Sequence, residues 1–166
     1  MEGMYAETCV KRAGTVKVYL LKALVIALFV LAFVMAWLTG NRLLYFFILL
    51  LAFGAYYLWP MFKVEIEYVF VDGQLDFDVI YGGQKRKQKL RIDFEQVEII
   101  APKNSHVLDS YNELRVMNFS SMRKDADVYA IIAKSEKSGL VKILFEPDEK
   151  MKSLMKMKSP SKFVTI

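Results

Sequence analysis

The chain has 166 residues, which is enough for one ordinary domain or for a small domain joined to a membrane anchor. Apolar residues make up 55% of it, more than soluble domains usually carry, and the excess is concentrated in residues 18–62, where Lys22 and Arg42 are the only charged residues. A single cysteine, Cys9, excludes an intrachain disulfide, and a single histidine, His106, excludes a metal site built on several histidines.

The first predicted element is a helical hairpin in the membrane. Residues 23–41 and 43–62 are uncharged stretches of 19 and 20 residues. At about 1.5 Å of rise per residue, each reaches the roughly 30 Å thickness of a bilayer's hydrocarbon core. We therefore expect transmembrane helices at about 18–38 and 43–60, joined by a tight turn at 39–42. A secretory signal peptide is the alternative, but its apolar body is usually shorter and is not followed at once by a second span.

Basic residues near the two spans predict their orientation. The turn carries one such residue, Arg42, whereas the N-terminal flank is rich in them. The basic residues of that flank are Lys11, Arg12, Lys17 and Lys22. The positive-inside rule then places the turn outside and both termini in the cytoplasm. We expect a cell-membrane protein with two spans, in which residues 1–17 form a cytoplasmic N-terminal segment.

Residues 63–166 have the pattern of a cytoplasmic, water-soluble β domain. They hold 18 Lys and Arg against 16 Asp and Glu. Apolar residues recur at every second position, which is typical of strands with one buried face. Asp72-Gly73 is a strong signal for a two-residue hairpin turn. About seven mostly antiparallel strands are expected, one of them near residues 114–119 within a stretch of weak periodicity.

A helix at about 147–158 is predicted to end the domain. Pro147 suits a helix start, and Asp148 and Glu149 complement the positive end of the helix dipole. An apolar stripe is expected to close one open end of the sheet; its residues are Met151, Leu154 and Met155. The alternative is a basic amphipathic helix lying on the membrane, for which this stripe is short. The residues of that basic face are Lys150, Lys152, Lys156 and Lys158.

The order of these elements resembles that of a known group of membrane proteins. A two-helix hairpin followed by "EYVFVDGQLDF", "VEII" and a closing "LFEPDEKMKSLM" resembles uncharacterised bacterial membrane proteins with an N-terminal two-helix transmembrane hairpin and a C-terminal pleckstrin-homology-like (PH-like) domain. The resemblance covers residues 63–158 as an order of elements and 16–62 as an anchor. It implies an α+β fold, in which a C-terminal amphipathic helix closes a mainly antiparallel β domain. A lipocalin-like or other small barrel is the alternative, although it needs no closing helix.

The stretch GGQKRKQKLR at residues 82–91 has two interpretations. It lies between the second and third predicted strands, where a solvated loop normally carries charge and where basic residues discourage edge pairing. The functional alternative is contact with anionic lipid headgroups, to which each basic residue contributes about 1 kcal/mol. The residues that would make this contact are Lys85, Arg86 and Lys87. Nucleic acid is not an expected partner, because the domain is nearly charge-balanced and has no recognised reading motif.

No residue pattern predicts catalysis, a metal or a cofactor. Ser105, His106 and Asp109 are close in the sequence, but no oxyanion-hole motif accompanies them. Glycine-rich phosphate loops are also lacking. Two carboxylate pairs spaced i, i+2 are expected on the solvated faces of strands, namely Glu65 with Glu67 and Asp76 with Asp78. We therefore expect a protein that is not an enzyme and has no catalytic, cofactor-binding or metal-binding residue.

The leading functional hypothesis is a membrane-anchored, non-enzymatic binding or scaffold protein that presents its PH-like domain at the inner membrane surface. Its expected partners are the lipid bilayer, with anionic headgroups, and an unidentified membrane or cytoplasmic protein. The alternative is a structural accessory subunit of a larger membrane transport or secretion complex, which uses the hairpin for assembly. A third hypothesis is an enzyme acting on membrane lipids through the Ser105, His106 and Asp109 cluster.

Overall fold

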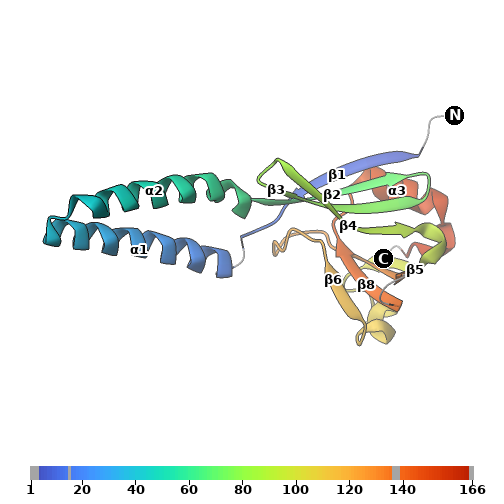
Figure 1. Ribbon diagram of the computed structural model, residues 1–166. Coiled ribbons are helices and arrows are strands. Elements are labelled where there is room, and N and C mark those ends of the chain that lie inside the picture. The colour runs from blue at the N-terminus through green and yellow to red at the C-terminus, as the bar shows by residue number, and fades with distance from the viewer. Residues whose placement is uncertain (1–3, 15, 136–138, 165–166) are drawn as a thin grey trace.

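The computed structural model consists of a long helical hairpin that projects from one end of a β domain (Figure 1). The hairpin comprises α1 (Val16–Thr39) and α2 (Arg42–Leu58), and the short 3-10 helix η1 (Trp59–Phe62) leads from α2 into the β domain. Residues 1–3 and 15 of the predicted N-terminal segment, and residues 136–138 and 165–166 of the predicted domain at 63–166, lie outside the described residues. The residues that the structure describes are 4–14, 16–135 and 139–164.

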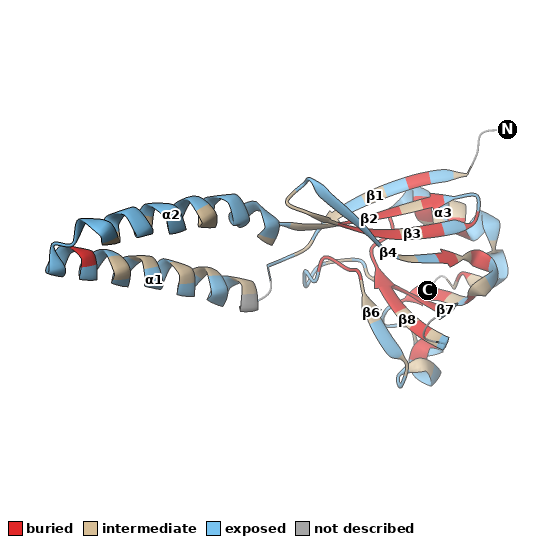
Figure 2. Cartoon of the chain, viewed as in Figure 1, coloured by how far each residue is buried: buried red, intermediate tan, exposed pale blue. Residues whose placement is uncertain are grey.

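The two helices of the hairpin lie where the sequence predicts them. Residues Val18–Thr39 and Arg42–Phe62 are long and apolar enough to cross a membrane. Most of their side chains are exposed (Figure 2), in contrast to the buried strands of the β domain. The predicted turn is also present: Gly40 has a positive φ of 64°, and the Asn41 side chain accepts the N–H of Leu43 at 3.0 Å. Both features suit a tight turn that starts a second helix.

One face of α1 is turned toward α2. The residues on this face are buried or half-buried at alternating spacings of four and three, which is the pattern of a helix packed along one stripe. We call this stripe the seam. Its residues on α1 are Val18, Lys22, Val25, Phe29, Ala32 and Ala36.

Four antiparallel strands form the first sheet, in the order β1-β2-β3-β4. Asp72 and Gly73 connect β2 to β3 with positive φ values of 48° and 102°, as a two-residue hairpin turn requires. Alternate side chains of the strands face the core, as the period of two predicts. The strand bounds are Tyr5–Lys11 for β1, Val64–Val71 for β2, Gln74–Tyr81 for β3 and Lys85–Asp93 for β4.

Strand β1 lies within residues 1–17, where the sequence analysis predicts no strand. It pairs along its whole length with β2, from Tyr5 opposite Val71 to Lys11 opposite Glu65. The hairpin of helices is therefore an insertion between two neighbouring antiparallel strands. Consequently the β domain is built from both sides of the insertion rather than from residues after 63 alone.

The second sheet has the order β5-β7-β8-β6. Its central strands pair antiparallel, whereas β6 pairs parallel with β8. Parallel pairing requires a connection that crosses over, which here runs from β6 through β7 before the chain returns as β8. All seven strands expected after the hairpin are present, and the parallel edge strand departs from a simple meander. The bounds are Val97–Pro102 for β5, Arg115–Asn118 for β6, Tyr129–Ser135 for β7 and Gly139–Phe145 for β8.

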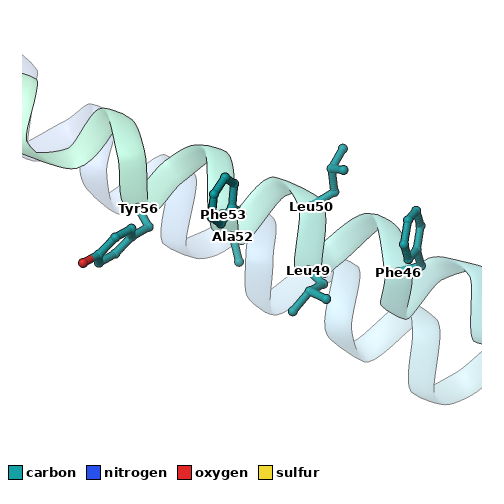
Figure 3. Close-up of a pocket in the computed structure, with 6 residues that line it drawn as sticks. All are labelled: Phe46, Leu49, Leu50, Ala52, Phe53 and Tyr56. Atoms are coloured by element: carbon teal, nitrogen blue, oxygen red, sulfur yellow. The ribbon is translucent and has the colours of Figure 1, made fainter.

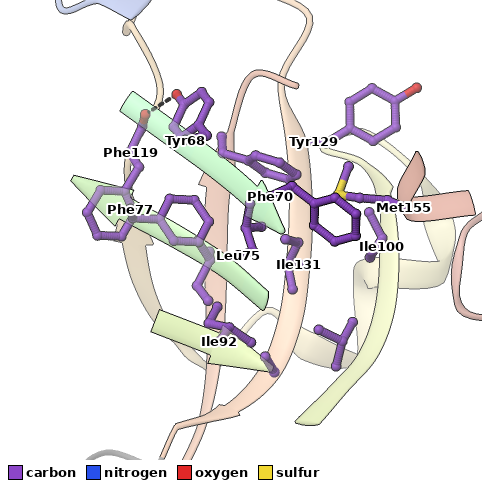
Figure 4. Close-up of a cluster of buried hydrophobic side chains, with 14 of the residues drawn as sticks. Tyr68, Phe70, Leu75, Phe77, Ile92, Ile100, Phe119, Tyr129, Ile131 and Met155 are labelled. Carbon is purple, nitrogen blue, oxygen red and sulfur yellow. Dashed lines mark hydrogen bonds between the residues drawn. The ribbon is translucent and has the colours of Figure 1, made fainter. Parts of the chain in front are cut away.

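The core lies between the two sheets, and aromatic side chains fill its centre (Figure 4). The ring centroid of Phe77 lies 5.7 Å from that of Tyr68, 4.8 Å from that of Phe119 and 5.8 Å from that of Phe145. These are the separations at which aromatic pairs attract one another. The Tyr68 hydroxyl donates to the carbonyl oxygen of Phe119 at 2.5 Å, so its polar end is satisfied inside the core.

Helix α3 (Glu149–Lys158) closes one end of the β domain, which confirms the predicted α+β architecture. Met151 and Met155 are fully buried in the main core, and Leu154 packs against it. Asp148 caps the helix, because its side chain accepts the N–H of Met151 at 2.8 Å. The apolar stripe is thus used by the domain itself rather than by a membrane surface.

Candidate membrane-proximal site

The joints between the hairpin and the β domain are short and tied to the domain by backbone hydrogen bonds. As a result, the β3–β4 turn and the connection between β6 and β7 lie at the base of the hairpin (Figure 1). A short, bonded joint keeps this end of the domain against the helices. Three hydrogen bonds run from a backbone N–H to a backbone carbonyl oxygen: from Arg12 to Val64 (2.9 Å), from Ala13 to Ser121 (2.8 Å) and from Gly82 to Lys63 (2.8 Å).

A pocket of about 370 Å³ lies at this base, between the start of α1 and the η1–β2 segment. We call it the basic pocket, because four cationic residues and a single carboxylate, that of Glu65, line it. The cations are Lys11, Arg12, Lys22 and Lys63. Within the described part of the chain, none of the four forms an ion pair with a carboxylate. The pocket therefore carries a net positive charge.

Neutral groups hold two of these cations in place. The Nζ atom of Lys22 lies 5.0 Å from the ring centroid of Trp59 and 5.6 Å from that of Phe62, in the range of cation–π attraction. The Nη2 atom of Arg12 donates to the carbonyl oxygen of Asn118 at 3.4 Å. These contacts orient the side chains but leave their charges available to an anion.

An apolar groove of about 500 Å³ runs between the two helices. We call it the interhelical groove. Val25 lies three residues beyond Lys22 on the seam of α1, so the groove begins about one helical turn from the basic pocket. The groove-lining residues are Val25, Leu28, Phe29 and Ala32 on α1, and Leu50, Leu51, Gly54, Ala55 and Leu58 on α2.

The predicted lipid-contact residues Lys85, Arg86 and Lys87 do not act as one group. The sequence analysis expects them in a loop, but strand β4 begins at Lys85, so their side chains alternate between the two faces of the sheet. Arg86 turns to the outer face, where its guanidinium pairs with Glu67 and its Nε lies 2.6 Å from Oδ2 of Asp78. Among the described residues, Lys85 and Lys87 form no ion pair, and both are exposed.

The carboxylates on the outer face of the first sheet are engaged by arginines. Both oxygens of Asp76 accept from Arg91 at 2.6 Å. Burial raises the pKa of the Asp78 carboxyl, and the nearby charge of Asp76 adds to this effect, whereas Arg91 opposes it. The prediction that both i, i+2 pairs lie on solvated faces is therefore wrong for Glu67 and Asp78, which are buried beneath Arg86. No cluster of three or more His, Cys, Asp and Glu that would suit a metal occurs among the residues that the structure describes.

The cluster of Ser105, His106 and Asp109 lies in the connection between β5 and β6. The Nδ1 atom of His106 is 3.3 Å from Oδ2 of Asp109, on the short 3-10 helix η3 (His106–Tyr111). The His106 side chain is fully exposed, and the side chain of Ser105, at the N-cap of the helix, accepts no capping hydrogen bond. The structure thus places these residues at the surface and not in a recess.

A further hollow of about 520 Å³ lies on the outer side of α2. All six lining side chains come from this one helix (Figure 3), and the only polar atom among them is the hydroxyl of Tyr56. A hollow of this kind has almost no polar group that could orient a polar ligand. The remaining lining residues are Phe46, Leu49, Leu50, Ala52 and Phe53.

Sequence reasoning missed the basic pocket. It used Lys11, Arg12 and Lys22 only to orient the hairpin, because their convergence depends on the pairing of β1 with β2. The available signal was the position of Lys22 on the same helical stripe as Val18, Val25 and Phe29. Helical side chains tilt toward the N-terminus of their helix, so a cation on the stripe that faces the second helix points toward the base of the hairpin.

Comparisons with known proteins agree with this architecture. No curated protein and no solved structure matches the chain. A family model described as a bacterial PH-like domain, DUF6106, matches residues 2–165. The match spans β1, the inserted helical hairpin, both sheets and the closing helix. The chain therefore belongs to the bacterial PH-like domain family DUF6106.

Proposed function

We propose that this protein is a membrane-anchored, non-enzymatic binding or scaffold protein whose hairpin crosses the cell membrane twice and holds the PH-like domain at the inner surface. The observation that carries the proposal is the insertion of the hairpin between β1 and β2. Because these strands are neighbours in one sheet, both ends of the hairpin emerge on the same side of a bilayer. The joints are short, so the domain sits end-on against the membrane.

The charge distribution supports a cytoplasmic position for the domain. Lys63 adds to the basic flank at the base of the hairpin, whereas the turn at the far end carries Arg42 alone. Basic residues next to a span favour the cytoplasmic side. The exposed Lys85 and Lys87 lie near the same base and add attraction to anionic lipids, while the far end of the domain remains accessible to a protein partner.

The single cysteine provides a direct test of this topology. Cys9 is exposed on β1. We expect a membrane-impermeant thiol reagent to leave Cys9 unlabelled in intact cells and to label it after the membrane is opened. Partial burial raises the pKa of the Cys9 thiol, with Glu65 and Glu7 adding to the effect, so the labelling needs time to reach completion in the opened sample.

The matched control moves the thiol to the far end of the hairpin. In the double variant Cys9→Ser/Gly40→Cys, the thiol lies in the turn between the helices. A Cβ there would meet nothing within 4 Å, and the positive φ of 64° costs a side chain about 1–2 kcal/mol but leaves it exposed. This variant should be labelled in intact cells. Labelling of Cys9 in intact cells, or protection of the cysteine at position 40, would contradict the proposed topology.

The accessory-subunit hypothesis remains the second candidate, because the hollow on α2 offers an apolar surface that another membrane helix would cover. Exchanging both helices for an unrelated hairpin, with β1 and β2 unchanged, separates the two hypotheses. A scaffold should still co-purify with its protein partner from mild detergent after the exchange. An accessory subunit should lose its partner, and a native chain that purifies alone would count against both.

A further inference from the structure

The basic pocket has the features of a site for a negatively charged group. Four cations and one carboxylate converge on about 370 Å³, and the cations have no carboxylate partner among the described residues. The walls come from three elements, because Lys11 is on β1, Lys22 on α1 and Lys63 in the joint before β2. Several cations held close together repel one another, so an anion bound among them would be stabilised.

The interhelical groove lies next to the pocket along the hairpin. Lys22 of the pocket and Val25 of the groove are on the same stripe of α1, and on the other side Leu58 of the groove is four residues before Phe62 of the pocket. The groove is lined only by aliphatic side chains, glycine and one phenylalanine. The basic pocket is cationic, and the interhelical groove, about one helical turn deeper, is apolar. A phospholipid has the two matching parts, an anionic headgroup and apolar acyl chains.

We infer that the basic pocket and the interhelical groove form a discrete site for one anionic phospholipid, with its phosphate-bearing headgroup in the pocket and an acyl chain in the groove. The inference rests on the proposed function, in which the hairpin crosses the membrane. It goes beyond general attraction of basic residues to a membrane surface, because it assigns one lipid to one site. The bound lipid fills the gap between the helices and neutralises the base of the hairpin.

Charge complementarity decides between this occupant and the alternatives. A second protein helix would fill the groove but would leave the four cations of the pocket without a partner. A free phosphate ion would neutralise the pocket but leave the apolar groove unfilled. An anionic phospholipid satisfies both parts with one molecule, and the inner leaflet supplies it at the depth of Lys22.

The test uses native mass spectrometry of the full chain in detergent, with added phosphatidylglycerol or phosphatidylcholine. We expect one phosphatidylglycerol to be retained per chain in preference to phosphatidylcholine. The double variant Lys22→Gln/Lys63→Gln removes two cations from opposite walls and should weaken retention about 25-fold, since each basic residue contributes about fivefold. The matched control Lys150→Gln/Lys156→Gln removes two exposed cations on α3, outside the pocket, and should leave retention within about twofold.

A second pair of variants tests the groove. A Cβ added at Gly54 meets nothing within 4 Å, so Gly54→Leu is compatible with the fold and fills the groove. Ala52→Leu adds similar bulk on the outer side of the same helix. Retention of phosphatidylglycerol should fall in Gly54→Leu and stay unchanged in Ala52→Leu.

Four results would overturn the inference: equal retention of the two lipids, equal loss in the Lys22/Lys63 and Lys150/Lys156 variants, an unchanged Gly54→Leu variant, or displacement of the lipid by millimolar inorganic phosphate. None of these results alters the labelling of Cys9, so the proposed topology can hold while the lipid site fails. Conversely, external labelling of Cys9 would refute the cytoplasmic placement whatever lipid is retained.

Discussion

Replacing residues 14–62 with an Asn-Gly turn is expected to convert this protein into a soluble, folded β domain. Lys11 and Glu65 are paired in the register of β1 and β2, and the Arg12 N–H bonds the carbonyl of Val64 at 2.9 Å. Ala13 and Lys63 would then flank a two-residue turn, for which Asn-Gly is the preferred sequence. The change removes nearly all of the exposed apolar surface and leaves both sheets and α3 complete.

The informative comparison is a chain that begins at Lys63 and therefore lacks β1. Ala6 is fully buried in the core, and the whole of β2 loses one of its two neighbouring strands when β1 is removed. An unpaired strand edge beside an opened core favours aggregation. We expect this shorter chain to be largely insoluble, while the Asn-Gly chain gives dispersed amide signals and slow amide exchange in β2. A soluble, well-folded chain from Lys63 onward would contradict the role assigned to β1.

The elements that were predictable are those with strong local patterns. Two uncharged stretches separated by Gly40 and Asn41 defined the hairpin, and strict alternation with Asp72-Gly73 defined β2 and β3. Strand β1 has the same alternation, but its inward residues are Ala6, Thr8 and Val10, of which one is small and one is polar. Its place in the sheet comes from pairing with β2, which lies more than fifty residues later. No local signal carries that information.

The candidate site was less predictable than the fold, for the same physical reason. A cluster of basic residues in the sequence indicates positive charge, but the face of the sheet on which each side chain lies depends on where the strand begins and how it pairs. Arg86 is directed to Glu67 and Asp78 by the start of β4 at Lys85, whereas Lys11 and Lys63 meet because β1 and β2 are neighbours. The basic pocket combines cations from three separate stretches of the chain, at 11–12, 22 and 63, whereas the adjacent Lys85 and Arg86 lie on different faces of the sheet.

Phe77→Ala is expected to produce the largest loss of stability among single core changes. The side chain is fully buried and its ring touches Tyr68, Phe119 and Phe145, so it connects the first sheet to the second sheet and its connecting loop. Truncating a buried phenylalanine removes its transfer free energy and leaves a cavity, which together cost about 3–5 kcal/mol. Small domains are stable by only about 5–15 kcal/mol, so the native state would become marginal. Urea unfolding of the full chain in detergent, followed by near-ultraviolet circular dichroism, measures this loss.

The effect of Phe77→Ala should extend to the base of the hairpin. The ring of Phe119 stacks on Phe77 at 4.8 Å, and two residues later the carbonyl of Ser121 accepts the N–H of Ala13 in the joint before α1. Loosening Phe119 weakens the hold on Ser121, so the amide of Ala13 should exchange faster in Phe77→Ala. Val107→Ala, at an exposed position, is the control and should change neither measurement. A loss of stability below about 1 kcal/mol in Phe77→Ala would show that the two sheets do not meet at this ring.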